Sequence, residues 1–193
     1  MPRSNRFSRL PQILAAAFFI PLIGLACAGS GAGIGPNANA PLQVVDSVDL
    51  ERFAGLWYVI SSMPTGAEEG AHNSTEHYAL RDDGGIDITN RFLVGGFDGP
   101  EKIITMRGWI HDETSNAEWR VQPIWPLRLS YLILELDPDY QYVVVGHPSK
   151  NYVWIMSRTP ALDPGIEASL RANLAEAGYD VDRIQVMPQN SAS

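Results

Sequence analysis

The chain has 193 residues, a formal net charge of −8 and 45% hydrophobic residues, which is enough for one ordinary domain with a sizeable core. Lys and Arg total 14 against 22 Asp and Glu, so the balance lacks the basic surface that a nucleic-acid backbone requires. A single cysteine excludes an internal disulfide and a cysteine-based zinc site. We therefore predict a fold held by its core, with no nucleic-acid partner, no metal and no cofactor.

The first 26 residues are typical of an export signal. Three arginines precede an apolar run over 13–25, which is shorter than the roughly twenty residues of a membrane-spanning helix. The run ends beside Cys27, and this arrangement resembles a bacterial lipoprotein signal, in which the cysteine becomes the acylated first residue. Gly24 departs from that signal, which prefers leucine or another branched residue there. The other interpretation is a plain secretory signal, with Cys27 removed or unused.

Composition divides the chain into four predicted segments. They are a lipoprotein signal peptide over 1–26, a flexible tether over 27–43, a folded domain over 44–189 and a tail over 190–193. The tether is rich in Ala, Gly, Asn and Pro and has no apolar periodicity. Because the rest of the chain is acidic, we expect membrane attachment to depend on acyl chains rather than on attraction to anionic lipid. The lipoprotein resemblance, with no Asp after Cys27, implies the periplasmic face of the outer membrane.

From residue 44 onward, short strand-like runs alternate with turn signals. The expected strands lie over 56–63, 72–80, 85–94, 102–110, 117–122, 130–136, 141–146 and 152–157. Their connections are too short for parallel crossovers, which predicts an antiparallel up-and-down meander, and eight strands suit a small closed barrel. The apolar runs 132–134 and 143–145 indicate strands that are covered on both faces.

A helix near the end of the chain can provide that cover. Asp163 is a good N-cap, Pro164 suits the first helical position, and Gly178 suits the C-terminus. Apolar residues recur between them at helical spacing. One more short strand is expected over 183–187. The predicted fold class is all-β, an eight-stranded antiparallel barrel with one C-terminal α-helix packed outside.

Three motifs resemble those of the lipocalin family and follow in the family's order and spacing. A G-x-W motif lies within 53–58, the run 137–140 is similar to the second motif, and 154–158 is similar to the third. The similarity covers about 48–189 and points more narrowly to the bacterial outer-membrane lipocalins, with plant temperature-induced lipocalins and apolipoprotein D. The motif residues to which the resemblance assigns a structural role are Gly55, Trp57, Asp139, Tyr140 and Arg158.

The first and third motifs also have a physical interpretation. Gly55 lets the chain leave a short helical turn over 50–54 with a positive φ and enter the first strand. Trp57 would lie at the narrow floor of the barrel, with Arg158 across its indole in a cation–π contact and its N–H groups on nearby carbonyls. We expect these two side chains to plug one end of the barrel. The other interpretation gives them ligand contact or catalysis.

Strand periodicity predicts which side chains face the barrel interior. Counting every second residue from Trp57 and Arg158 selects an aromatic and apolar surface with few hydroxyls, which suits a lipid-like ligand with one polar end. The parity of 102–110 is ambiguous. In the other interpretation these side chains fill the barrel and leave no cavity. The candidate lining residues are Val59, Ser61, Ile86, Ile88, Trp119, Val121, Tyr131, Tyr152, Trp154 and Met156.

We predict a binding protein rather than an enzyme. The catalytic lipocalin that isomerises prostaglandin needs a thiol inside the barrel, and no cysteine follows Cys27; the four histidines show no triad signature. The resemblance implies storage or transport of fatty acids, lysophospholipids or similar amphiphiles, in membrane maintenance or a stress response. The alternatives are a haem or bilin carrier, an enzyme acting on a bound lipid, and a structural envelope protein. The oligomeric state stays open, a homodimer included.

Overall fold

The computed structural model describes residues 41–190. The predicted signal peptide over 1–26 and the predicted acylation site at Cys27 lie outside the described residues. The barrel strands are β1 (Gly55–Met63), β2 (Ala71–Leu80), β3 (Gly85–Val94), β4 (Glu101–Ile110), β5 (Glu118–Ile124), β6 (Leu127–Leu136), β7 (Tyr142–Gly146) and β8 (Val153–Ser157). All eight predicted runs are confirmed as strands, with bounds shifted by at most three residues.

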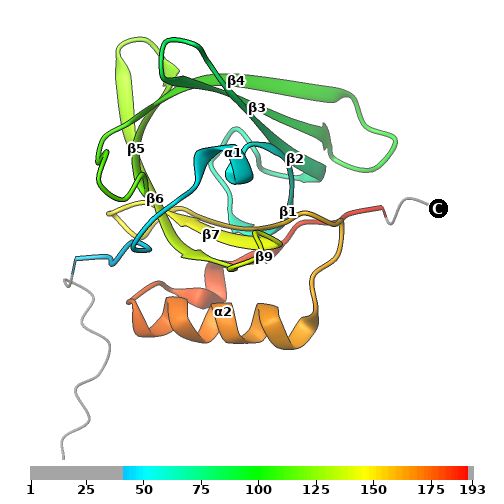
Figure 1. The fold of residues 1–193 in the computed structure, drawn as a ribbon. Helices are drawn as coiled ribbons and strands as arrows, with labels where there is room; N and C mark the ends of the chain where they lie inside the picture. The colour runs from blue at the N-terminus through cyan, green and yellow to red at the C-terminus, as the bar shows by residue number, and fades with distance from the viewer. Residues whose placement is uncertain (1–40, 191–193) are drawn as a thin grey trace, which may run out of the picture. The chain divides into compact units, whose positions relative to one another are not determined.

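Each strand pairs with its neighbours in the chain, and β1 pairs with both β2 and β8, which closes the barrel. Every pairing is antiparallel, so the predicted up-and-down topology is confirmed (Figure 1). The expected strand over 183–187 is shorter than predicted. It has only two residues, β9 (Gln185–Val186), which pair with β1 and follow a 3-10 turn, η1 (Val181–Arg183).

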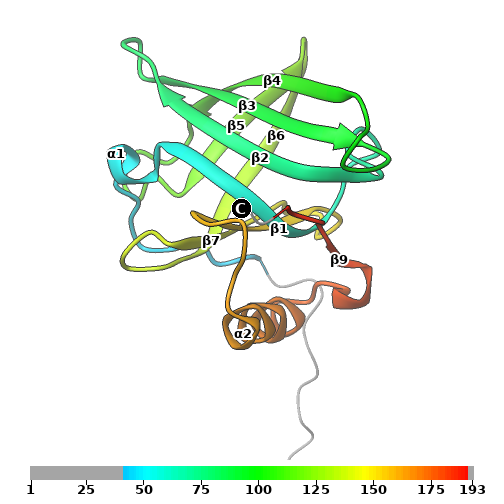
Figure 2. The same ribbon diagram turned by 90° about the vertical axis from the view of Figure 1, so that its right-hand side faces the viewer.

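Helix α2 (Pro164–Glu176) lies outside the barrel (Figure 2). As predicted, the side chain of Asp163 caps it by accepting hydrogen bonds from two main-chain N–H groups. Leu170 and Leu174 are buried against Val144 of β7 and Ile155 of β8. The apolar run over 143–145 thus has one face in the barrel and the other under the helix, as its lack of alternation indicates.

The closed end of the barrel, as we call it, is formed by helix α1 (Leu50–Phe53) and the start of β1. Seen along the barrel in Figure 1, α1 lies within the outline of the ring of strands, and Figure 2 shows it at one end of the barrel. Gly55 follows the helix with a φ of 96°, a left-handed conformation that glycine adopts at little cost. Among the described residues, no helix has the length and apolar character needed to cross a bilayer.

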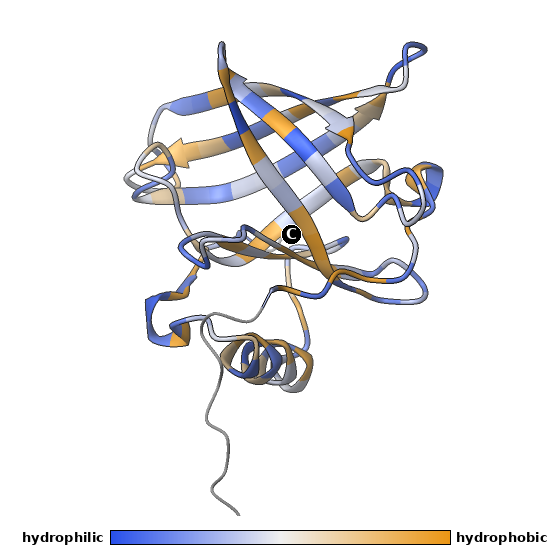
Figure 3. Ribbon diagram, turned by 90° about the vertical axis from the view of Figure 1, so that its left-hand side faces the viewer, coloured by the Kyte–Doolittle hydropathy of each residue, from blue (hydrophilic) through white to orange (hydrophobic). Residues whose placement is uncertain are grey.

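Apolar and polar residues alternate along the strands (Figure 3), but strand β1 interrupts this alternation. A bulge between Val59 and Ser61 shifts the register against β8, so that Ser61 lies opposite Ile155 and Ser62 lies opposite Trp154. Directly opposed residues share a face of the sheet, and Ile155 faces helix α2. The prediction that Ser61 faces the interior is therefore wrong, because one extra residue reverses the parity of the strand.

Candidate functional site

The closed end is held together by Arg158. Its guanidinium carbon lies 3.8 Å from the centroid of the Trp57 ring, and Trp57 is fully buried. The guanidinium donates hydrogen bonds to the main-chain carbonyl oxygens of Arg52 (2.6 Å), Phe53 (3.0 Å), Leu56 (2.8 Å) and Tyr140 (3.3 Å). The side chain thus ties α1, β1 and the loop before β7 to one another.

Tyr140 supports the same end from the loop over 137–141. Its hydroxyl accepts a hydrogen bond from the main-chain N–H of Asp49 at 2.8 Å, and the guanidinium of Arg52 lies 4.1 Å from its ring centroid. The acidic side chain that shapes this loop is that of Asp137, which accepts from the main-chain N–H groups of Asp139 and Gln141. Asp139 is exposed, so the structural role expected of its side chain belongs to Asp137.

Above the closed end, the barrel is filled with side chains. The Phe53 ring lies 5.2–5.3 Å from the rings of Trp57, Tyr78 and Trp119, and Trp119 stacks on Tyr131 at 5.1 Å. Half of the candidate lining residues belong to this packed region rather than to a cavity wall. They are Val59, Ile86, Ile88, Trp119 and Met156, each at most 1% exposed.

The other half of the interior holds a cavity of about 290 Å³, near the lower limit of the roughly 300–1,000 Å³ typical of small-molecule sites. It lies toward the cavity end, our name for the end that carries the loops over 64–70, 95–100, 125–126 and 147–152, opposite α1. Its surface is predominantly apolar. Four of the candidate lining residues lie on its wall: Val121, Tyr131, Tyr152 and Trp154.

Twelve further residues of the wall were not among the candidates. The parity of 102–110, ambiguous in the sequence, is resolved with Ile104 and Met106 inward. Glu76 lies two residues before the inward-facing Tyr78, so strand periodicity could have found it. The remaining wall residues are Thr65, Ala67, Glu68, Asn90, Pro123, Leu127, Leu129, Ser130 and His147.

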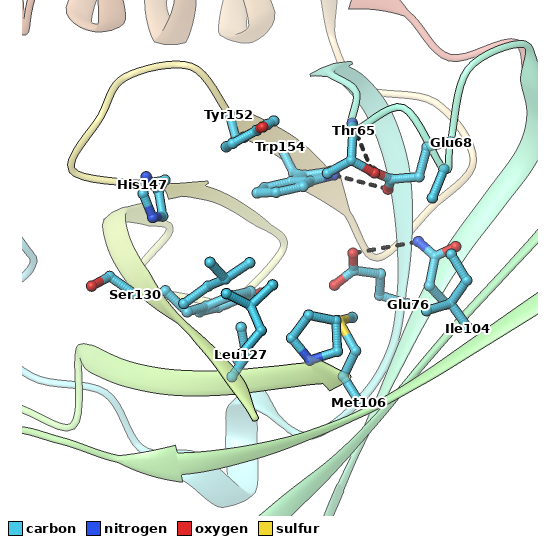
Figure 4. A pocket seen from close by; sticks show the side chains of 16 residues that line it. Thr65, Glu68, Glu76, Ile104, Met106, Leu127, Ser130, His147, Tyr152 and Trp154 are labelled. Atoms are coloured by element: carbon cyan, nitrogen blue, oxygen red, sulfur yellow. Dashed lines mark hydrogen bonds between the residues drawn. The ribbon is translucent and has the colours of Figure 1, made fainter. Parts of the chain in front are cut away.

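Glu76 is the most unusual polar group of the wall. Its side chain is 4% exposed, and Figure 4 shows its carboxyl group pointing into the space between Trp154 and Met106. It accepts hydrogen bonds from the Tyr78 hydroxyl and, at 3.4 Å, from the Asn90 amide. Burial is the main reason that the pKa of Glu76 rises from its usual 4.5 to about 7, because an apolar environment disfavours the charged form.

A second carboxylate, that of Glu68, organises the loop over 64–70. It accepts hydrogen bonds from the Thr65 main-chain N–H at 3.0 Å, the Thr65 hydroxyl at 2.7 Å and the Trp154 indole N–H at 3.1 Å (Figure 4). These bonds fix the orientation of the Trp154 ring at the wall. Within 41–190, no group of three His, Cys, Asp or Glu side chains is placed to hold a metal ion.

Comparisons with known proteins agree with this architecture. The family model of the lipocalin-like domain matches residues 48–189 of this chain. Temperature-induced lipocalin-1 of Arabidopsis thaliana is 31% identical over 158 residues, which cover 77% of this chain and 83% of that protein. The outer membrane lipoprotein Blc of Citrobacter freundii is 28% identical over 189 residues, or 95% and 98% of the two chains.

The solved structure of insecticyanin from the tobacco hornworm Manduca sexta has a TM-score of 0.59 and 18% sequence identity, and the match covers 77% of this chain and 84% of that one. This likeness concerns the fold: a closed antiparallel barrel with a helix outside. The motifs, the barrel and the matched family model together show that the chain belongs to the lipocalin-like family.

Proposed function

We propose that this protein is a carrier of small amphiphiles, such as fatty acids or lysophospholipids, rather than an enzyme. The observation that carries the proposal is the cavity of about 290 Å³ with its largely apolar wall. Each methylene group moved from water to such a surface contributes about 0.8 kcal/mol. A hydrocarbon chain is therefore the ligand that this wall favours.

The place of the carrier follows from its relatives and from its first residues. Curated relatives that match more than nine-tenths of the chain carry the name outer membrane lipoprotein. We propose that this protein is also anchored in the outer membrane, through acyl chains on Cys27, and that its barrel faces the periplasm. A role in membrane maintenance or stress would suit a carrier in that position.

A pair of neighbouring residues on β4 tests the cavity. Ile104 lies on the cavity wall, whereas Ile103 is 46% exposed on the outer face of the barrel. Ile104→Trp should fill the cavity and weaken lysophospholipid and fatty-acid binding by about tenfold or more, measured by titrating delipidated protein and following Trp fluorescence. Ile103→Trp is the matched control and should bind as the wild type does. If wild type binds no such amphiphile, or if both variants bind equally well, the proposal is wrong.

The anchor has a separate test. Cys27→Ser should leave a folded, ligand-binding domain but move the protein from the outer-membrane fraction to the soluble periplasm, because a serine offers no thiol for acylation. Fractionation followed by mass spectrometry of the mature N-terminus measures both effects. A wild-type protein that is already soluble and begins elsewhere would instead support the plain secretory signal.

A further inference from the structure

The charged side chains of the cavity wall have one sign. Glu68 and Glu76 line it, and among the residues that the structure describes the wall contains no lysine and no arginine. Of the described residues in the wall, only His147, in the loop over 147–152, has a basic side chain. Burial lowers the pKa of its imidazole below the usual 6.5. A carboxylate or phosphate group inside this cavity would therefore meet acidic oxygens and no permanent positive charge.

The acceptors at Glu76 are only partly used. Among the described residues Glu76 forms no ion pair, and its hydrogen bonds come from Tyr78 and Asn90 alone. A carboxylate offers about four acceptor positions. The neighbouring side-chain oxygen of Asn90 is buried and has no hydrogen-bond partner, and Asn90 itself is 2% exposed. The Glu76 carboxylate, whose two oxygens each accept one hydrogen bond, thus keeps unused acceptor positions on the cavity wall.

Leaving such groups unpaired is costly. A buried acceptor without a donor costs about 1–3 kcal/mol, and a buried carboxylate without a counter-charge costs more. A group that carries both a positive charge and several N–H bonds would give the Glu76 carboxylate a counter-charge and further donors. The aromatic rings of Tyr131, Tyr152 and Trp154 lie on the same wall, and aromatic faces attract cations.

We propose that the cavity selects amphiphiles with a protonated amino group, and that the Glu76 carboxylate receives that group while the alkyl chain lies along the apolar wall. This inference rests on the proposed carrier function and names the chemical class of its ligand. The ammonium group can belong to a free alkylamine or to the ethanolamine head of a lysophospholipid. A fatty acid can bind only with its carboxylate outside the wall that Glu68 and Glu76 form.

The proposal predicts a dependence on pH. Around Glu76 lie the Tyr78 and Tyr131 phenols, whose pKa values burial raises well above 10, the Glu68 carboxylate, the Asn90 amide and His147. Arg158, which interacts electrostatically with Tyr78, stays charged over the same range, as guanidinium groups do. Because the pKa of Glu76 rises to about 7, its carboxyl group gains a negative charge between pH 5 and 8, and affinity for an ammonium group should rise across that range.

The test compares ligands that share one alkyl chain. Decylamine, decanol and decanoate are titrated against delipidated wild-type protein at pH 8, where a primary amine is still protonated. We expect decylamine to bind about tenfold more tightly than decanol, and decanoate more weakly than either. Lysophosphatidylethanolamine and lysophosphatidylglycerol, which differ in the amino group of the head, form a second pair that distinguishes a lipid source from a free amine.

Two variants test whether Glu76 causes the preference for decylamine. Glu76→Gln keeps an acceptor for the Tyr78 hydroxyl but removes the charge, and it should abolish both the decylamine preference and its dependence on pH while decanol binds unchanged. Glu101→Gln removes the same charge from an exposed residue at the cavity end and should change neither. Equal binding of the three decyl ligands, or a preference that survives in Glu76→Gln, would overturn the inference but leave the carrier function intact. Failure of every ligand to bind would overturn both.

Discussion

The two ends of this barrel contain similar aromatic side chains but differ in how completely their buried polar groups are paired. At the closed end, the Arg158 guanidinium donates to four carbonyl oxygens and the Trp57 indole N–H donates to the Phe53 carbonyl at 2.8 Å. At the cavity end, Glu76 has no counter-charge within the described residues and one Asn90 oxygen has no donor. Paired polar groups stabilise the first region, whereas the second contains the partly paired carboxylate that we propose as the ligand-binding group.

This contrast separates stability from binding within one continuous sheet. Satisfied buried groups contribute about 1 kcal/mol each to folding, while unsatisfied ones oppose it by a similar or larger amount. The closed end should therefore be the place where substitutions destabilise the fold without affecting ligands. At the cavity end, removing a buried charge should stabilise the fold and weaken binding.

The largest effect is expected for Arg158→Ala. This variant leaves four carbonyl oxygens without their donor and removes the cation–π contact with Trp57, which together should cost about 4 kcal/mol. For a domain of this size the melting temperature should fall by roughly 10 °C, as measured by thermal denaturation followed by circular dichroism. Ligand affinity at 25 °C should stay that of the wild type. A loss of affinity at unchanged stability would mean that the ligand binds at the closed end and not in the cavity.

Glu76→Gln is expected to change the stability of the fold by less than Arg158→Ala does, and to raise it rather than lower it. The pKa of Glu76 rises from its usual 4.5 to about 7 on folding, so the unfolded chain releases its proton at lower pH than the folded one. The wild type should therefore lose stability as pH rises from about 4.5 through 7, by about 3 kcal/mol in all. The glutamine variant lacks this slope and should be the more stable protein at pH 8. Denaturant titrations of both proteins at several pH values measure the difference, and parallel profiles would contradict it.

The barrel was predictable because its signals are local. Turn residues such as those at 82–85 and short alternating runs define the strands, and the cap at Asp163 with its apolar spacing defines the helix that covers β7 and β8. Ser61 was misplaced for an equally physical reason. A bulge inserts one residue into a strand without any composition signal, and every parity assignment beyond it is reversed.

The cavity was harder to predict because periodicity gives the face of a residue and not its depth along the barrel. Trp119 and Val121 share one face of β5, yet Trp119 is packed against Phe53 and Val121 borders the cavity. Glu76 escaped prediction because a search for apolar alternation passes over a carboxylate. Its inward position follows from that of Tyr78, but its burial depends on side chains from other strands and on the loop that Glu68 holds.

Two glycines allow the smallest test of the comparison. Gly55 at the closed end has a φ of 96°, whereas Gly66 at the cavity end has no positive φ, and a Cβ there would meet no atom within 4 Å. Gly55→Ala should cost about 1–2 kcal/mol, because alanine is strained at positive φ. Gly66→Ala should be neutral or stabilise the protein by up to about 1 kcal/mol, because it reduces the freedom of the unfolded chain. Chemical denaturation of the two variants measures the difference between them. Equal losses of stability at both positions would mean that the loop over 64–70 is as tightly constrained as the entry to β1, against the contrast drawn between the two ends.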